Sequence, residues 1–270
     1  MRSLKKILSS SYALLPLKER GGVRILMFHE ILDHQVEPIL NLIHFLKKKY
    51  SIISPTDYQR AIYSSRPCFI ISFDDGFKSQ YKIADEVLDF LGVKALFFVC
   101  PAFVRLKEDN ALAFIRENME RRDVQVLSTA YEPIDWKALK DLSKRGHVIG
   151  CHSMSHARLS TLTNDADFKR EIVDAGKKIS DRLECEVSWF AYPFGDIKSI
   201  NRKAINIIGE NYRYCCSGLR GINTQSTNSL CISRQSQQLN QPLNFSANVA
   251  LGAFDFVYMF KYFKLNRMVQ

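Results

Sequence analysis

Two adjacent carboxylates, Asp74 and Asp75, stand directly after an apolar run at residues 68–73 and before Gly76. A run of this composition is typical of a buried strand. Two acids at its end are costly to bury unless nearby charge compensates them. A bound metal ion would supply that charge. The alternative is an Asp-Asp-Gly turn that caps the next helix, and the pair alone does not decide between the two.

Two histidines, His152 and His156, are separated by three residues. On a helical turn or a tight loop, this spacing places both imidazoles within reach of one ion. Two histidines and one carboxylate form a facial triad, which leaves metal positions open for water and substrate. Two ordinary histidines at the start of a helix are the alternative. Together with the acid pair, the spacing favours a hydrolytic metal site.

The elements that must position these groups alternate between strands and helices. Strands are predicted over Val23–Ile31, Cys68–Phe73, Lys94–Cys100, His147–Cys151, Val187–Tyr192, Arg213–Cys216 and Leu230–Ser233. Helices are predicted over Val36–Tyr50, Phe77–Leu91, 107–122, Ile134–Lys144, Asn164–Leu183 and Lys198–Ile208, with Asn164 as an N-cap. The alternation argues for a parallel sheet covered by helices, and seven strands favour a closed barrel over an open sheet.

Polar clusters follow four of these strands directly. They are His-Glu at 29–30, Asp-Asp-Gly at 74–76, the segment from His152 to His156, and Pro-Phe-Gly-Asp at 193–196. In α/β barrels the C-terminal ends of the strands converge on one face, where the chemistry takes place. Groups far apart in the sequence are therefore expected to meet in one pocket. Taken alone, His29 is more typical of a strand-end histidine satisfied by local hydrogen bonds.

Length and charge limit the other possibilities. The chain has 270 residues, of which 46% are hydrophobic, enough for one barrel of roughly 250 residues. The net charge is +10, carried as +5 by residues 1–24 and +5 by residues 211–270. These ends are either solvated or attracted to an anionic surface, such as a membrane or a phosphorylated substrate. No motif places a basic helix or an aromatic sheet against bases, so no nucleic-acid partner is expected.

The two ends also bear on location. The first residues loosely imitate a signal peptide, but their apolar stretch is short and no cleavage site follows it, so we expect them to be retained. No run of 18 uncharged apolar residues predicts a transmembrane helix. Seven cysteines without a CxxC pair favour a reducing compartment. We expect a cytoplasmic protein, either free or apposed to a membrane. The aromatic segment at 254–263 is expected to cap the core, with an amphipathic interfacial helix as the alternative.

At this point the sequence resembles the polysaccharide deacetylase family, the NodB-homology type. The matching segments are Leu26–His29 (LMFH), Ser72–Gly76 (SFDDG), Gly146–Leu159 (GHVIGCHSMSHARL) and Phe190–Gly195 (FAYPFG). The resemblance covers roughly residues 23 to 235. It implies a distorted (β/α)7-type barrel of the α/β class in a single domain. We accordingly expect a deacetylase domain at 23–240, a basic extension at 1–22, and an aromatic and basic extension at 241–270.

The resemblance also implies roles for individual residues. Asp75, His152 and His156 look like the metal ligands, and Asp74 looks like the general base. Ser153 would steady the loop that carries the two histidines. The expected substrate-binding residues are Tyr192, Pro193, Phe194, Gly195 and Arg234, with the Phe194 backbone N–H as an oxyanion donor. The expected metal is Zn²⁺, although the same ligand set suits Co²⁺, Ni²⁺ or Fe²⁺.

The chain departs from the family pattern in two places. An arginine often stands two residues before the third-motif proline, where this chain has Ala191. Arg234 is a candidate to orient Asp74 in its place. The late Leu-x-His that carries the general acid in many members is absent, since no histidine follows His156. The opening Leu-Met-Phe-His resembles a permuted branch of the family, so His29 is assigned as the acid and His147 as structural.

These features predict a metal-dependent deacetylase. The expected substrate is the N-acetyl group of a GlcNAc-type amino sugar, in a bacterial polysaccharide, a lipopolysaccharide or a lipid-linked glycan precursor. The basic ends favour peripheral membrane contact during such a step. O-deacetylation or deformylation of a sugar is a second reading of the same site. A catalytically inactive glycan-binding module of the same fold is the third.

Overall fold

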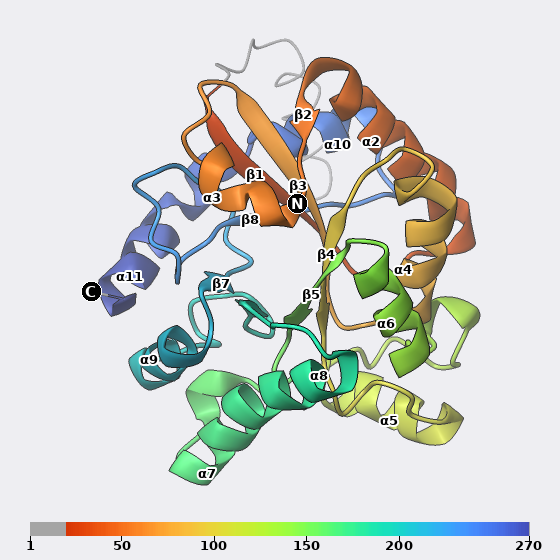
Figure 1. Cartoon of the computed structure of the whole chain (residues 1–270), viewed down its shortest axis with the longest axis vertical. Helices are drawn as coiled ribbons and strands as arrows, with labels where there is room; N and C mark the ends of the chain where they lie inside the picture. The colour runs from red at the N-terminus through yellow and green to blue at the C-terminus, as the bar shows by residue number, and fades with distance from the viewer. Residues whose placement is uncertain (1–19, 270) are drawn as a thin grey trace.

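Within residues 20–269, which the computed structural model describes, parallel strands follow one another around a nearly closed barrel (Figure 1). The strands are β1 (Gly22–Phe28), β2 (Ser51–Ile52), β3 (Pro67–Phe73), β4 (Ala95–Val99), β5 (Val148–Cys151), β6 (Trp189–Ala191), β7 (Tyr214–Cys216) and β8 (Arg234–Ser236). Seven of them run in the order β7-β6-β5-β4-β3-β1-β8, and β2 pairs with β3 off this path. A bridge between Cys216 and Ile232 brings the two ends of the path together. The expected α/β barrel of the distorted (β/α)7 type is confirmed.

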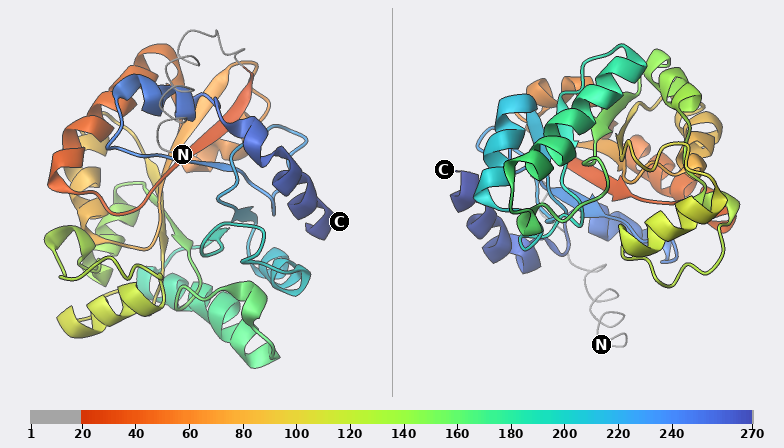
Figure 2. Two further views of the ribbon diagram at one scale, coloured as in Figure 1. Left: turned by 180° about the vertical axis from the view of Figure 1, so that it is seen from behind. Right: turned by 90° about the horizontal axis from the view of Figure 1, so that it is seen from below.

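Helices surround the strands, as the two further views show (Figure 2). They are α2 (Val36–Lys49), α3 (Tyr58–Ala61), α4 (Lys78–Ile83), α5 (Glu108–Glu117), α6 (Trp136–Lys144), α7 (Asp165–Phe168), α8 (Ala175–Leu183), α9 (Arg202–Asn211), α10 (Leu243–Ala250) and α11 (Met259–Val269). A π-helical stretch, Lys169–Asp174, joins α7 to α8, so the predicted long helix is one continuous rod. Its predicted N-cap is confirmed, because the Asn164 side chain accepts a hydrogen bond from the Asp167 N–H at 2.8 Å.

Strand alternation separates two hydrophobic clusters. Leu26, Phe69, Ile71 and Phe97 pack outward with apolar residues of the surrounding helices. The residues between them form a second cluster inside the barrel, which includes Val23, Ile25, Cys68, Ile70, Leu96, Phe98, Trp189, Ala191, Tyr214 and Cys216. Side chains two residues apart share a face of a strand. His29, Asp74 and His152 continue the inward series at the C-terminal ends of β1, β3 and β5.

Gly150 shows how tightly the barrel interior is filled. It lies on β5, two residues before His152. A Cβ atom at this position would come within 2.6 Å of the Phe98 ring and 3.1 Å of the Trp189 carbonyl oxygen. Only glycine therefore lets β5 approach β4 and β6 closely enough to bring His152 to the mouth of the barrel.

Two predicted elements are displaced. The last predicted strand, 230–233, is wrong: Ile232 makes only an isolated bridge, and the ladder with β1 runs through 234–236. The strand was predicted at 230–233 because residues 230–232 are apolar, whereas the strand in the structure begins with the buried Arg234. The helix predicted from Lys198 begins instead at Arg202, because the Asn201 side chain accepts the Ala204 N–H at 2.9 Å and caps it.

The predictions for the chain ends meet the structure only in part. The signal-like residues and most of the basic segment 1–22 lie outside the described residues. At the other end, α11 packs Tyr262, Met268 and Val269 against the core, and Tyr258 packs there from the 3-10 turn just before the helix, so one side of this segment caps the core as expected. No helix in the described range of the chain has the length and apolarity needed to cross a bilayer.

His147 lies inside the protein as a structural group, 3% exposed. Its Nδ1 accepts the Ala95 N–H at 3.1 Å, and its Nε2 lies 3.3 Å from the Asp89 carboxylate. Burial is the main cause that lowers the pKa of His147 to about 4; Lys94 and Arg145 lower it further, and Asp89 opposes the shift. The imidazole therefore stays neutral in the folded protein at neutral pH.

This histidine predicts sensitivity to acid. Its pKa in the unfolded chain is near 6.5, so the unfolded state binds its proton first as the pH falls. This group does not reduce the free energy of unfolding above about pH 6.5. Between about pH 6.5 and pH 4 it lowers the free energy of unfolding by about 3 kcal/mol, because only the unfolded chain takes up the proton. His147→Asn keeps an acceptor for Ala95 and cannot titrate. We expect denaturant unfolding measured from pH 7 to pH 4 to show a flatter decline for this variant; parallel declines would contradict the assignment.

Candidate active site

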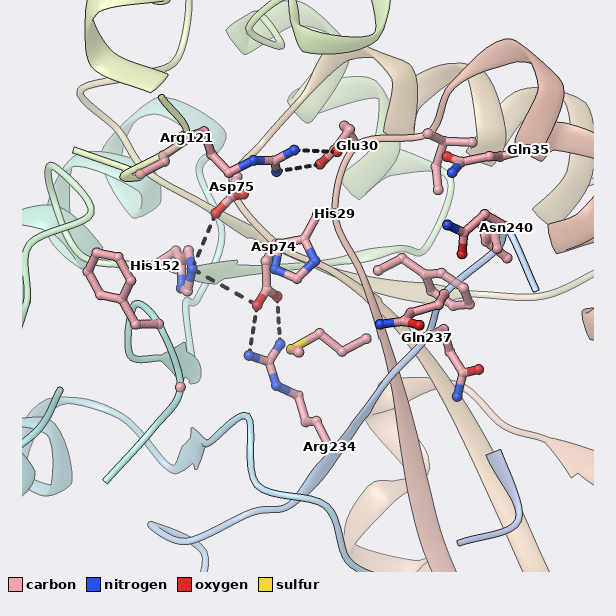
Figure 3. A pocket seen from close by; sticks show the side chains of 18 of the residues that line it. His29, Glu30, Gln35, Asp74, Asp75, Arg121, His152, Arg234, Gln237 and Asn240 are labelled. Carbon is pink, nitrogen blue, oxygen red and sulfur yellow. Dashed lines mark hydrogen bonds and ion pairs between the residues drawn. The ribbon is translucent and has the colours of Figure 1, made fainter. Parts of the chain in front are cut away.

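A cavity of about 780 Å³ opens at the C-terminal ends of the strands (Figure 3). Its floor carries His29, Asp74, Asp75 and His152, from loops after β1, β3 and β5. Its rim carries side-chain amides from the segment after β8. The lining residues include Glu30, Gln35, Arg121, His156, Phe194, Gly195, Arg234, Gln237, Gln238, Asn240 and Gln241. The barrel thus brings the separate polar clusters of the sequence into one pocket.

Asp75, His152 and His156 lie close enough to share one ion. The Asp75 Oδ1 atom is 3.5 Å from His152 Nε2 and 3.4 Å from His156 Nε2. One ligand atom from each of the three residues falls within 4.8 Å of the other two. All three side chains are buried, between 2% and 6% exposed. The predicted ligand set is therefore brought together.

The remaining ring nitrogens decide how the two imidazoles are oriented. His152 Nδ1 lies 2.6 Å from the Ala191 carbonyl oxygen, and His156 Nδ1 lies 3.0 Å from the Asn118 carbonyl oxygen. Because a carbonyl only accepts, each Nδ1 carries the proton, so in the neutral imidazole each Nε2 turns its lone pair toward Asp75. The Asp75 Oδ1 atom is buried and has no hydrogen-bond partner in the part of the chain that the structure describes. Asp75 Oδ1 and the two Nε2 atoms are thus three electron-pair donors that face one another, an arrangement that fits a divalent cation.

Asp74 is held by a different partner. Both its carboxylate oxygens accept hydrogen bonds from the Arg234 guanidinium, at 2.5 and 2.8 Å. Arg234 also donates to the Ser217 carbonyl at 3.0 Å and lies over the Phe98 ring. Burial raises the pKa of Asp74, but the charge and hydrogen bonds of Arg234, with the nearby His152, bring the pKa below its ordinary value. Asp74 is therefore ionised, 4.0 Å from His152 Nε2.

Strained backbone concentrates at this pocket. Asp75, Ser153, His156 and Phe194 all have positive φ, between 59° and 78°. Non-glycine residues rarely adopt this conformation, and it persists only where surrounding contacts enforce it. The Ser153 hydroxyl accepts the Ala157 N–H at 3.2 Å, in agreement with the expected steadying of this loop.

A buried glutamate anchors the same loop. Glu171, fully buried in the π-helical stretch between α7 and α8, accepts the Ser155 N–H at 2.9 Å and the Ser155 hydroxyl at 2.8 Å. Its backbone carbonyl accepts the Met154 N–H at 3.0 Å. The widened turn of the helix therefore meets the loop between the two histidines with three acceptor contacts.

The predicted substrate residues fall into two groups. Phe194 and Gly195 line the cavity, and the Phe194 ring packs against His156 at 4.8 Å between centroids. Tyr192 and Pro193 are buried and do not line it; the Tyr192 hydroxyl donates to the Gly195 carbonyl at 3.0 Å and so holds the loop from behind. Arg234 reaches the cavity, but its guanidinium is engaged by Asp74.

Comparison with known proteins places the chain in a family. Residues 62–212, more than half of the chain, match the model for polysaccharide deacetylases. The chain belongs to the polysaccharide deacetylase family. Membership identifies it as a hydrolase of amide bonds. Deacetylases of this family use a divalent metal, and the triad of Asp75, His152 and His156 is the candidate site for it. No curated protein matches the sequence.

Solved structures of deacetylases share the fold. The polysaccharide deacetylase BC0361 from Bacillus cereus is 16% identical, with a TM-score of 0.66 over 85% of this chain and 69% of that one. The Streptococcus pyogenes deacetylase PplD, solved with acetate, is 18% identical, with a TM-score of 0.63 over 83% and 96%. A de-N-acetylase from Aggregatibacter actinomycetemcomitans is 14% identical, with a TM-score of 0.65 over 84% and 99%.

Several residues of this family member's pocket escaped the sequence analysis. Arg121 binds Glu30 through two hydrogen bonds of 2.8 and 3.0 Å (Figure 3). Tyr131 donates to the same carboxylate. Asn118 holds His156 through its carbonyl and donates its amide to the Ser155 carbonyl. Neither Asn118 nor Arg121 belongs to a motif. The glutamine-rich stretch 235–241 was a visible compositional signal that the sequence analysis left unused.

The Arg234–Asp74 pair makes a prediction about stability. Arg234→Met leaves a buried carboxylate without its partner, so we expect the free energy of unfolding to fall by about 3–5 kcal/mol. Adding Asp74→Asn should recover part of that loss, because no unpaired charge then remains. Denaturant titration of the single and double variants measures both effects.

A surface ion pair provides the matched control. Arg60 contacts Asp57 at 3.1 Å with its own side chain 86% exposed, so Arg60→Met should change the unfolding free energy by less than about 1 kcal/mol. A loss at Arg234 no larger than the loss at Arg60 would show that the guanidinium does not compensate a buried charge.

Proposed function

We propose that the protein is a metal-dependent deacetylase that removes the N-acetyl group from a GlcNAc-type sugar. Its substrate would be a bacterial polysaccharide, a lipopolysaccharide or a lipid-linked glycan precursor. The observation that carries the proposal is the paired arrangement of two carboxylates: Asp75 faces two imidazoles, while Asp74 is kept ionised beside them by Arg234. The domain that performs the reaction is proposed to span residues 23–240, flanked by the extensions 1–22 and 241–270.

The donor set supports a particular kind of ion. Two imidazole nitrogens and one carboxylate oxygen suit Zn²⁺, and also Co²⁺, Ni²⁺ or Fe²⁺. When bound, such an ion lowers the pKa of a coordinated water and polarises a carbonyl oxygen. In this proposal Asp75, His152 and His156 hold the ion, and the carbonyls of Ala191 and Asn118 hold the two imidazoles.

Asp74 serves as the general base. Its depressed pKa keeps it charged at neutral pH, so it is ready to accept a proton from the attacking water. The bidentate contact with Arg234 holds the carboxylate plane and prevents it from turning toward the triad. Many family members carry an arginine at the position of Ala191, and in this proposal Arg234 orients Asp74 in its place. In this proposal it acts through Asp74 and does not contact the substrate.

His29 is proposed as the general acid. It lines the cavity on the β1 side, and Figure 3 shows its ring beside Asp74. A protonated imidazole there can donate to the departing amine. The backbone N–H of Phe194, which lines the same cavity from the loop after β6, is proposed to donate to the oxyanion.

The rim chemistry supports a sugar substrate. Gln35, Gln237 and Asn240 offer amide donors and acceptors of the kind that bind sugar hydroxyls. Both arginines of the pocket are neutralised, Arg121 by Glu30 and Arg234 by Asp74. Among residues 20–269, the pocket therefore has no unpaired arginine to attract an anionic group, which favours a neutral amino sugar.

An assay on matched substrates tests the proposed reaction. N-acetyl, N-formyl and O-acetyl forms of one sugar are supplied side by side, and the acid released is measured. We expect the N-acetyl form to be hydrolysed with the highest kcat/KM. Asp74→Asn should lower kcat by about 100- to 10,000-fold and still bind metal, whereas His152→Ala should lose both.

Two outcomes of this assay would contradict the proposal. A preference for the O-acetyl or N-formyl form would make the enzyme an esterase or a deformylase that uses the same residues. Near-normal turnover by Asp74→Asn would remove the base assignment. Denaturant unfolding of each variant controls for loss of the fold.

The role of His29 predicts a dependence on the leaving group. An amine must be protonated as it departs, but a nitrophenolate leaves without a proton. His29→Gln should therefore lower kcat on the N-acetyl sugar by at least about 100-fold and change the hydrolysis of 4-nitrophenyl acetate far less. Asp74→Asn, which removes the base, should slow both. Equal losses on both substrates for His29→Gln would contradict an acid role.

A further inference from the structure

The outer side of α11, together with the 3-10 turn Asp255–Tyr258 just before it, carries an unusual concentration of apolar groups. Nine large hydrophobic side chains are exposed in the described part of the chain, and five of them fall between residues 256 and 263. Phe260 is 81% exposed and Phe263 is 57% exposed. Val257 and Met259 lie beside them in sequence, at 57% and 49%. We call Val257, Met259, Phe260 and Phe263, with Lys261, Lys264 and Arg267, the C-terminal patch.

The patch lies on a helix that is fixed to the body. Leu265 is fully buried, and Tyr262 and Val269 pack against the main core from the same side of α11. Tyr258, in the 3-10 turn just before the helix, packs against the core as well. The Arg202 guanidinium donates to the Arg267 carbonyl at 3.0 Å, and Asp255 before the helix pairs with Arg24 at 2.8 Å. Met259, Phe260 and Phe263 share the opposite side, since residues three and four apart lie on one face. The exposed aromatics are therefore presented on an ordered surface.

The charged side chains within the patch all have one sign. Lys261, Lys264 and Arg267 are exposed, and no acidic residue occurs from 256 to 269. Figures 1 and 2 show α11 at one edge of the molecule, so its outer side is open to a large flat partner. Protein interfaces are typically depleted of lysine. Aromatic side chains interleaved with lysine and arginine are typical of helices that lie in a membrane interface.

We propose that the C-terminal patch is a peripheral contact for a membrane surface rich in anionic lipid. Phe260, Phe263 and Met259 would enter the boundary between headgroups and acyl chains, and the three cations would face the anionic headgroups. The core-capping and interfacial alternatives for this segment then describe two sides of one helix. The inference concerns binding and is independent of the reaction assigned to the pocket.

Vesicle sedimentation with the full chain tests this surface. Vesicles of phosphatidylcholine with 30% phosphatidylglycerol are compared with pure phosphatidylcholine at low ionic strength. We expect stronger binding to the anionic vesicles, weakening as salt is added. Lys261→Gln, Lys264→Gln and Arg267→Gln together should weaken the partition coefficient by about 100-fold. Phe260→Ser with Phe263→Ser should weaken it by at least about tenfold.

Matched controls separate the patch from general charge and apolarity. Lys137→Gln, Lys177→Gln and Lys178→Gln remove three exposed cations elsewhere, and Phe90→Ser removes an aromatic that is 80% exposed. These variants should bind vesicles like the wild type. All α11 variants should retain wild-type hydrolysis of a water-soluble substrate. Vesicle sedimentation does not require catalysis, so it tests the patch even if the proposed reaction is wrong.

Three results would overturn the proposal. The first is equal binding to neutral and anionic vesicles, or none to either. The second is undiminished binding by both sets of α11 variants, which would place the contact elsewhere, for example in the basic residues 1–19. The third is a concentration-dependent dimer that the Phe260→Ser, Phe263→Ser variant abolishes while vesicle binding is absent; the patch would then join two copies of the chain.

Discussion

The bidentate contact between Arg234 and Asp74 is the interaction on which the site depends. It joins β8 to the end of β3 across 160 residues of sequence, with both side chains almost fully buried. Desolvating two charges is expensive, and a buried pair of this kind is weak evidence of selection for stability. Its consequence here is chemical. The pair keeps one carboxylate ionised and correctly oriented within 4.0 Å of an imidazole that faces a second carboxylate.

The barrel also determines where the other site residues lie. Parallel strands bring their C-terminal ends to one face, and period-two alternation turns His29, Asp74 and His152 toward the same interior. Asp75 and His156 require something further, since neither continues an inward series. Both have positive φ, and the contact of Ser155 with Glu171, in the π-helical stretch between α7 and α8, anchors the loop that carries His156. The fold provides three of the groups by geometry and the other two by backbone strain.

Much of this was predictable because the local signals were strong. The apolar runs that end in SFDDG and in the histidine motif indicate both the end of a strand and a reactive side chain. The same segments therefore predicted both the barrel and the triad. The β8 strand was misplaced because its inward residue is the arginine that serves the site, which broke the apolar pattern. Asn118, Arg121 and Glu171 were missed for another reason: each acts through a contact that only the folded chain creates.

The most direct test of the central claim is a crystal structure of the metal-loaded protein, with the ion located by anomalous scattering at its absorption edge. The account predicts one ion bound by Asp75, His152 Nε2 and His156 Nε2, with Asp74 still held by Arg234 and absent from the coordination sphere. An ion bound elsewhere, or one that draws Asp74 away from Arg234 as a ligand, would contradict the division of roles between the two carboxylates.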